Sequence, residues 1–161
     1  MNVFDIIGPV MIGPSSSHTA GAVRLGRVAN KLTDNRPLKK VEITLSGSFA
    51  QTYKGHGTDR ALLAGLMGYH SYSAEIRDAL EIAKSSGIDY VFLKEEIRDA
   101  HPNTARIRFI LEDGTEGTVQ GASVGGGNIL VNLVIRIHPD IFSRHGDLNA
   151  RKTVFGIDGK I

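Results

Sequence analysis

Cysteine is absent from this chain of 161 residues. Without thiols, the chain can form no disulfide, use no thiolate nucleophile, and hold no cysteine-ligated zinc or iron–sulfur centre by itself. No apolar run approaches the ~20 residues that cross a membrane. The N-terminus also lacks the basic stretch and apolar core of a secretory signal. We therefore expect no membrane partner and a cytoplasmic location.

Excess charge of one sign is also absent. The net charge is only +2, and the basic side chains are scattered along the chain rather than gathered in one tract. A nucleic-acid partner is therefore not expected. The length predicts a single domain with a sizeable core, and a hydrophobic content of 41% is close to the usual globular composition.

The spacing of hydrophobic residues predicts an α+β fold. Helices are expected over roughly 19–33, from Thr58 onward, and from Ser73 to a stop at Gly87, with Thr58 and Ser73 as caps. Strands are expected over 41–45, 88–93, 105–112, 118–124 and 129–137. The segment Gly47–Gly57 is expected to be a loop. Segregated helices and a late antiparallel meander favour a two-layer sandwich, with helices on one face of a mixed or antiparallel sheet.

A polar segment near the start, Gly13–Gly21, stands just before the first expected helix. It contains Ser15, Ser16, Ser17, His18 and Thr19. Backbone N–H groups at the start of a helix lack internal partners and carry partial positive charge, so they form a natural anion site. An imidazole there adds a group that exchanges a proton near neutral pH. Simple helix capping needs only one hydroxyl, so the segment indicates a ligand or catalytic site.

A second histidine-bearing segment, Gly55–Asp59, also precedes an expected helix. Its glycines allow the backbone to approach a ligand closely, and Asp59 is near enough in sequence to orient an imidazole. A flexible surface loop with a capping residue would explain the same residues. Two such segments in one small domain favour the hypothesis that they share a single site.

Other motifs are less informative. His101–Thr104 is typical of a turn. Gly121–Asn128 has neither the spacing nor the following helix of a phosphate-binding loop. A bulge or a turn between strands is therefore expected. Close approach of this backbone to a ligand or a partner chain is the alternative. His70, His138 and His145 are isolated, and no pair of histidines has the spacing of a metal site.

Together these motifs resemble the β chain of the bacterial iron–sulfur-dependent L-serine dehydratases. The residues that carry the resemblance are Gly13–Thr19, Gly55–Asp59, His101–Thr104 and Gly121–Asn128. The resemblance implies a lyase, L-serine ammonia-lyase, which converts L-serine to pyruvate and ammonia. It also implies a fold similar to the allosteric substrate-binding domain of D-3-phosphoglycerate dehydrogenase.

The resemblance further implies a 4Fe–4S cluster on cysteines of an α domain, with one iron open to the substrate hydroxyl. Because this chain has no cysteine, it resembles the split β chain, and the cluster is expected on a separate α chain that contains cysteine. L-serine is the implied substrate, and β chains are expected to pair within a larger hetero-oligomer. No metal ligand is expected on this chain.

Elimination of water from serine requires removal of the α-proton, and a histidine suits that task. His18 and His56 are therefore the expected catalytic residues at the contact between the α and β chains. The residues expected to bind substrate beside them are Ser15, Ser16, Ser17, Thr19, Thr58 and Asp59. The sequence does not decide which histidine moves the proton.

Two other interpretations remain open at this point. A non-catalytic regulatory module would hold L-serine or another carboxylate in the same segments, and a structural subunit would seal the partner's cluster from water. Residues 1–148 are expected to form the β domain and residues 149–161 a linker, without the small ACT regulatory domain that can follow.

Overall fold

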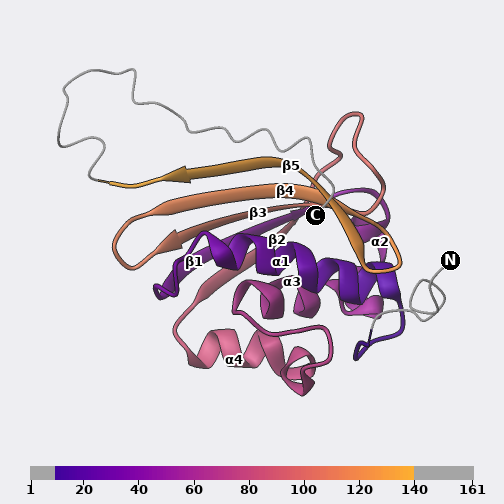
Figure 1. Cartoon of the computed structure of the whole chain (residues 1–161), viewed down its shortest axis with the longest axis horizontal. Coiled ribbons are helices and arrows are strands. Elements are labelled where there is room, and N and C mark those ends of the chain that lie inside the picture. The colour runs from indigo at the N-terminus through magenta and orange to yellow at the C-terminus, as the bar shows by residue number, and fades with distance from the viewer. Residues whose placement is uncertain (1–9, 140–161) are drawn as a thin grey trace, which may run out of the picture.

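The computed structural model describes residues 10–139, so the expected linker and domain boundary lie outside the described residues. Figure 1 shows two layers, a five-stranded sheet and a set of helices on one of its faces. This arrangement confirms the α+β two-layer class. Within residues 10–139, no helix has the length and apolar character needed to cross a membrane.

The helices belong mostly to the first half of the described chain. They are η2 (Ser16–Gly21), α1 (Ala22–Lys31), α2 (Gly47–His56), α3 (Thr58–Leu66), η3 (Ala74–Asp78) and α4 (Ala79–Ser85). The strands are β1 (Leu38–Leu45), β2 (Asp89–Lys94), β3 (Thr104–Leu111), β4 (Glu116–Gly125) and β5 (Asn128–Ile137). Every strand that the hydrophobic pattern predicted is therefore present, with ends shifted by one to three residues.

The sheet is mixed, with strand order β2-β1-β3-β4-β5. Strands β1 and β2 run parallel, and the remaining neighbours are antiparallel. Strand β1 shows why the alternating pattern was informative, because Val41, Ile43 and Leu45 are fully buried toward the helices. The β3–β4 hairpin turns at Gly114, whose φ of 82° suits glycine.

Helices α1 and α3 cross with their backbones in close approach. A Cβ atom on Gly26 would lie 2.3 Å from the Leu62 carbonyl oxygen, and one on Gly65 would lie 2.1 Å from the Val23 carbonyl oxygen. Only glycine fits at both positions. This crossing holds α1, and η2 directly before it, firmly against the core.

One predicted element was wrong, since Gly47–Gly57 is not a loop. Residues Gly47–His56 form helix α2, which ends at Gly57 in the left-handed conformation with φ of 70°. The glycines that suggested a loop mark the two ends of this segment, while Phe49 inside it is fully buried. A Cβ atom on Gly47 would meet Pro102 at 2.7 Å from its Cα, so the 101–104 turn packs against the start of α2.

One of the two predicted caps was also wrong. The residue at the N-cap of α3 is Gly57, and Thr58 is the first helical residue, with no side-chain capping bond. Ser73 does occupy the N-cap position of η3, but its hydroxyl makes no capping bond and instead accepts a hydrogen bond from the His70 backbone N–H at 3.0 Å. By contrast, the glycines Gly125–Gly127 form the expected turn between β4 and β5, with positive φ at each. A register shift within β4 follows Gln120.

Candidate active site

The site begins at the π-helical turn η2, which leads directly into α1. The Ser15 side chain caps this turn by accepting a hydrogen bond from the His18 backbone N–H at 3.3 Å. π-Helical turns are uncommon and often occur at functional sites. Here the wide turn, fixed by its cap and by α1 behind it, places His18 among buried neighbours.

Serine hydroxyls stand at both nitrogens of the His18 ring. Ser15 Oγ lies 3.3 Å from Nδ1, and Ser48 Oγ lies 3.3 Å from Nε2. The Phe49 ring packs edge-on against the imidazole, with ring centroids 5.2 Å apart. Because a hydroxyl can donate or accept, the two serines accommodate a proton on either nitrogen of His18.

His56 reaches the same place from a different part of the chain. It is the last residue of α2, directly before the left-handed Gly57, and its side chain is exposed. Its ring centroid lies 4.8 Å from that of His18, with the planes 85° apart. The two histidine-bearing segments are therefore neighbours in space, and one imidazole is buried while the other faces solvent.

Burial sets the protonation of the inner histidine. Desolvation lowers the pKa of His18 below the usual histidine value of 6.5, and the nearby His56 lowers it further. The His18 imidazole is therefore neutral at pH 7. A neutral imidazole is the form that can accept a proton.

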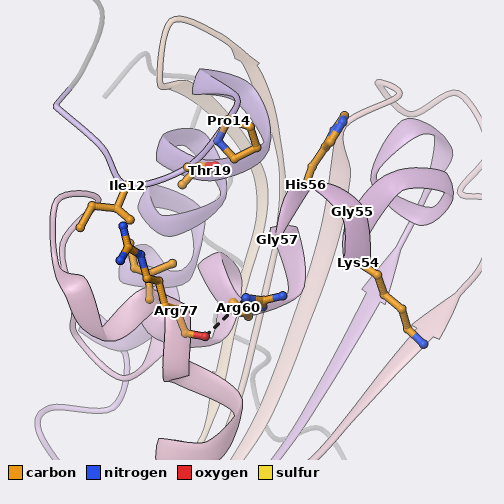
Figure 2. A pocket seen from close by; sticks show the side chains of 11 residues that line it. Ile12, Pro14, Thr19, Lys54, Gly55, His56, Gly57, Arg60 and Arg77 are labelled. Carbon is orange, nitrogen blue, oxygen red and sulfur yellow. Dashed lines mark hydrogen bonds between the residues drawn. The ribbon is translucent and has the colours of Figure 1, made fainter.

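A cavity of about 240 Å³ opens beside His56. It is lined by Ile12, Gly13, Pro14, Thr19, Lys54, Gly55, His56, Gly57, Arg60, Ile76 and Arg77. Figure 2 shows His56 across the cavity from Thr19 and Pro14, with Arg60 and Arg77 along the lower edge. No acidic residue is among the lining residues, so the cavity is positively charged and suited to an anion.

Buried hydroxyls next to this cavity lack partners. Thr19 Oγ1 and Thr58 Oγ1 are buried and make no hydrogen bond to any of the residues 10–139. A buried hydroxyl without a partner costs about 1–3 kcal/mol, so such groups are retained where something else can satisfy them. Thr19 lines the cavity, but its hydroxyl oxygen is itself buried.

Asp59 lies in the first turn of α3 and is 6% exposed. Burial raises the pKa of its carboxyl above the usual aspartate value of 3.8, although the Arg60 backbone N–H and the Arg60 and Lys54 charges act in the opposite direction. Its Oδ1 accepts a hydrogen bond from the Arg60 N–H at 2.8 Å. Asp59 does not line the cavity, and its hydrogen bond with the Arg60 N–H lies within the first turn of α3.

The structure separates the predicted site residues into four groups. His18, Ser15 and His56 form the ring cluster, and Thr19 and His56 line the cavity. Thr58 and Asp59 are buried behind it. Ser16 and Ser17 are half-buried and line no part of the cavity.

Sequence reasoning missed Ser48, Arg60 and Arg77. Ser48 was hidden because its segment was expected to be a loop rather than a helix that faces His18. Arg60 directly follows the Gly55–Asp59 motif, and a basic residue there was a usable signal. Arg77 lies on a separate turn, η3, and only the tertiary fold brings it to the cavity.

The iron–sulfur cluster implied by the resemblance does not fit the residues of this chain. The sequence has no cysteine. Among residues 10–139, no group of three or more histidine, cysteine, aspartate or glutamate side chains could hold a metal ion. A cysteine-ligated cluster would therefore need ligands from outside this sequence.

The fold and the site define an α+β domain that carries a pair of adjacent histidines beside a cationic cavity. The family model for the serine dehydratase beta chain matches residues 2–87. This match covers more than half of the chain and includes both histidine-bearing segments. The chain belongs to the family of serine dehydratase beta chains.

Individual relatives agree with this assignment. The chain is similar to the probable L-serine dehydratase beta chain of Bacillus subtilis (strain 168), with 48% identity over 153 residues, which cover 91% of this chain and 69% of that one. It is also similar to the L-serine dehydratase beta chain of Peptoniphilus asaccharolyticus, with 44% identity over 134 residues, covering 82% of this chain and 60% of that one.

The likeness extends to longer proteins. L-serine dehydratase 1 of Escherichia coli (strain K12) is 37% identical over 82 residues, which cover 47% of this chain and 17% of that protein. The chain therefore spans about two thirds of the length of the beta chains it matches and a much smaller part of this longer dehydratase.

Proposed function

We propose that this chain is the β subunit of a two-chain L-serine dehydratase and supplies acid–base groups to an active site at the contact with the α chain. The observation that supports this proposal is the 4.8 Å separation of the His18 and His56 rings, beside a cationic cavity. The names of the relatives identify L-serine as the substrate. A 4Fe–4S cluster, if present, is held by the cysteine-containing α chain.

The overall reaction removes the α-proton and the β-hydroxyl of serine as water. The resulting enamine tautomerises to an imine, and addition of water releases ammonia and leaves pyruvate. A base must therefore accept one proton from carbon, and an acid must return protons later. Histidine serves both roles near neutral pH.

His56 is the group that exchanges a proton with the substrate. It lines the cavity, whereas His18 lies behind it and contacts it ring to ring. His18 is held by Ser15 and Ser48 and stays neutral, so it positions the His56 ring without placing a positive charge beside it. Arg60 and Arg77 supply positive charge that attracts a carboxylate.

The test is a pyruvate-formation assay on the anaerobically co-purified α–β complex. We expect His56→Ala to lower kcat by about 10²–10⁴-fold, the usual contribution of a general acid or base. His101→Ala, on an exposed turn outside the cavity, is the matched control and should retain full activity. Normal turnover by His56→Ala would overturn the assignment.

The role of His18 is tested in the same complex through the pH profile. If His18 positions His56, then His18→Asn should lower kcat less than His56→Ala does and should shift the pH at which activity falls. An unchanged profile would contradict a positioning role. We expect the isolated β chain to form no pyruvate.

A further inference from the structure

A second cavity lies against α1, close to the start of the described chain. It has a volume of about 330 Å³, within the usual range of small-molecule sites, and is lined by Val10, Ala20, Val23, Arg24, Arg27, His70, Ser71, Tyr72 and Gly127. None of these residues lines the cavity beside His56. The two cavities are therefore distinct, although one segment contributes Val10 to this cavity and Ile12 to the other.

The arginines of the described chain divide into two groups. Five of them lie within 4.0 Å of a carboxylate, and these are Arg36, Arg98, Arg106, Arg108 and Arg136. The four that form no ion pair with another residue of the range 10–139 are Arg24, Arg27, Arg60 and Arg77. All four line one of the two cavities. Uncompensated guanidinium groups that gather in cavities indicate binding of an anion from outside the chain.

The guanidinium groups of the second cavity are held in place while keeping free donors. Arg24 Nη1 donates a hydrogen bond to the Gly127 carbonyl oxygen at 2.9 Å. Arg27 Nη1 lies 2.7 Å from His70 Nδ1, which can accept a hydrogen bond from it. Each guanidinium has five N–H donors, so these single bonds orient the groups and leave most donors available. Preorganisation of this kind lowers the entropy lost on binding.

The remaining walls suit an organic ligand rather than a bare inorganic ion. Val10 lines the cavity and leaves 74% of its surface exposed. The His70 ring stacks on the Tyr72 ring with centroids 5.1 Å apart, and Tyr72 is 57% exposed. An inorganic anion would leave these apolar surfaces in contact with water, whereas the carbon skeleton of an organic acid would cover them.

We propose that this cavity is a binding site for a small organic carboxylate, separate from the site beside His56. The carboxylate pairs with the Arg24 and Arg27 guanidinium groups, and the organic part packs against the apolar wall and the His70–Tyr72 ring pair. Ser71 connects the two cavities, because its hydroxyl donates to the Val10 carbonyl and its own carbonyl accepts from the Ile12 N–H.

The test is calorimetric titration of the full chain with pyruvate and, separately, with inorganic phosphate. We expect saturable pyruvate binding that weakens at least tenfold in the double variant Arg24→Gln/Arg27→Gln. The matched double variant Lys31→Gln/Lys39→Gln, at exposed positions outside both cavities, should stay within twofold of the original affinity.

Several outcomes would overturn the proposal. These are the absence of saturable binding, an equal loss in the matched variant, or phosphate binding as tight as that of pyruvate. If the glutamine variant does not fold, the double variant Arg24→Lys/Arg27→Lys is titrated in its place. Lysine keeps the positive charge of each side chain but lacks the planar set of N–H donors of the guanidinium group. The lysine variant must then weaken pyruvate binding, and unchanged affinity would refute the site. No arm of the experiment depends on serine turnover, so the result is independent of the proposed enzymatic role.

Discussion

The two histidines of the site stand on parts of the molecule that are built very differently. His18 precedes α1, whose backbone is locked against α3 at Gly26 and Gly65. His56 ends α2, a helix with only one buried residue, Phe49. The first histidine is buried and hydrogen-bonded, and the second is exposed.

This contrast separates a fixed half of the site from an adjustable half. Segments with few buried contacts open at lower free energy than core segments do. The α1–α3 crossing therefore fixes the position of His18, while α2 can shift His56 when a partner chain docks. Four predictions test this division, in order of decreasing effect.

The largest effect is expected at the helix crossing. In Gly65→Ala the new Cβ would lie 2.1 Å from the Val23 carbonyl oxygen, so α1 and α3 must separate. We expect the free energy of unfolding to fall by about 1–3 kcal/mol or more, as for overpacked cores. Urea denaturation measures it.

Gly55→Ala in α2 is the matched control for this substitution. No atom lies within 4 Å of the position that its Cβ would occupy, and alanine favours a helix over glycine by about 0.5–1 kcal/mol. This variant should therefore be slightly more stable than the original chain. Equal losses in both variants would show that the two halves do not differ in packing.

The second prediction compares the histidines themselves. His18→Ala removes a buried imidazole and leaves the half-buried Ser15 and Ser48 without their ring partner, and we expect a loss of about 1–3 kcal/mol in the free energy of unfolding. His56→Ala changes an exposed side chain, so its effect should stay within about 0.5 kcal/mol. Thermal denaturation of both variants tests this difference. A larger loss of stability in His56→Ala than in His18→Ala would contradict the division into a fixed and an adjustable half.

The fixed half of the molecule was also the half that the sequence predicted well. Alternation at Val41, Ile43 and Leu45 identified β1, and the spacing of Leu25 and Ala29 identified α1, because each reflects a strong burial pattern. Helix α2 was missed since burial of a single residue produces almost no periodicity. Its terminal glycines therefore dominated the prediction.

The candidate site was predictable where its residues cluster in sequence. Hydroxyls and a histidine beside a helix start identified His18, and the glycine-flanked motif identified His56. The cationic walls were not predictable, because Arg27 and Arg77 come from separate elements and no local pattern distinguishes them from paired arginines elsewhere. Only the three-dimensional arrangement shows which charges lack a partner.

The third prediction concerns Asp59, at the junction where α2 meets α3. Burial raises the pKa of this carboxyl, so the folded chain binds its proton more tightly than the unfolded chain does. The charged form therefore destabilises the fold once the pH rises above the usual aspartate range. Asp59→Asn removes that charge and can still accept the Arg60 N–H.

We expect Asp59→Asn to raise the free energy of unfolding at pH 7 by about 0.5–2 kcal/mol, as single stabilising substitutions commonly do. Asp78→Asn, at an exposed position, is the control and should change stability by less than about 0.5 kcal/mol. Destabilisation by Asp59→Asn would mean that the carboxylate makes a favourable interaction that outweighs its burial.

The smallest effect is a pH dependence that belongs to the fixed histidine. Burial lowers the pKa of His18 in the folded chain below the value of 6.5 for an unburied histidine. As the pH falls through 6.5, the unfolded chain therefore gains a proton that the folded chain does not, and stability declines until the folded pKa is passed. Well above pH 6.5 neither the folded nor the unfolded chain binds this proton, so His18 adds no pH dependence to the free energy of unfolding there.

We expect the original chain to lose more stability between pH 7.5 and about 5 than His18→Gln does, measured by urea denaturation. Equal losses would show that His18 titrates like an unburied imidazole, and the two halves of the site would then share one electrostatic environment.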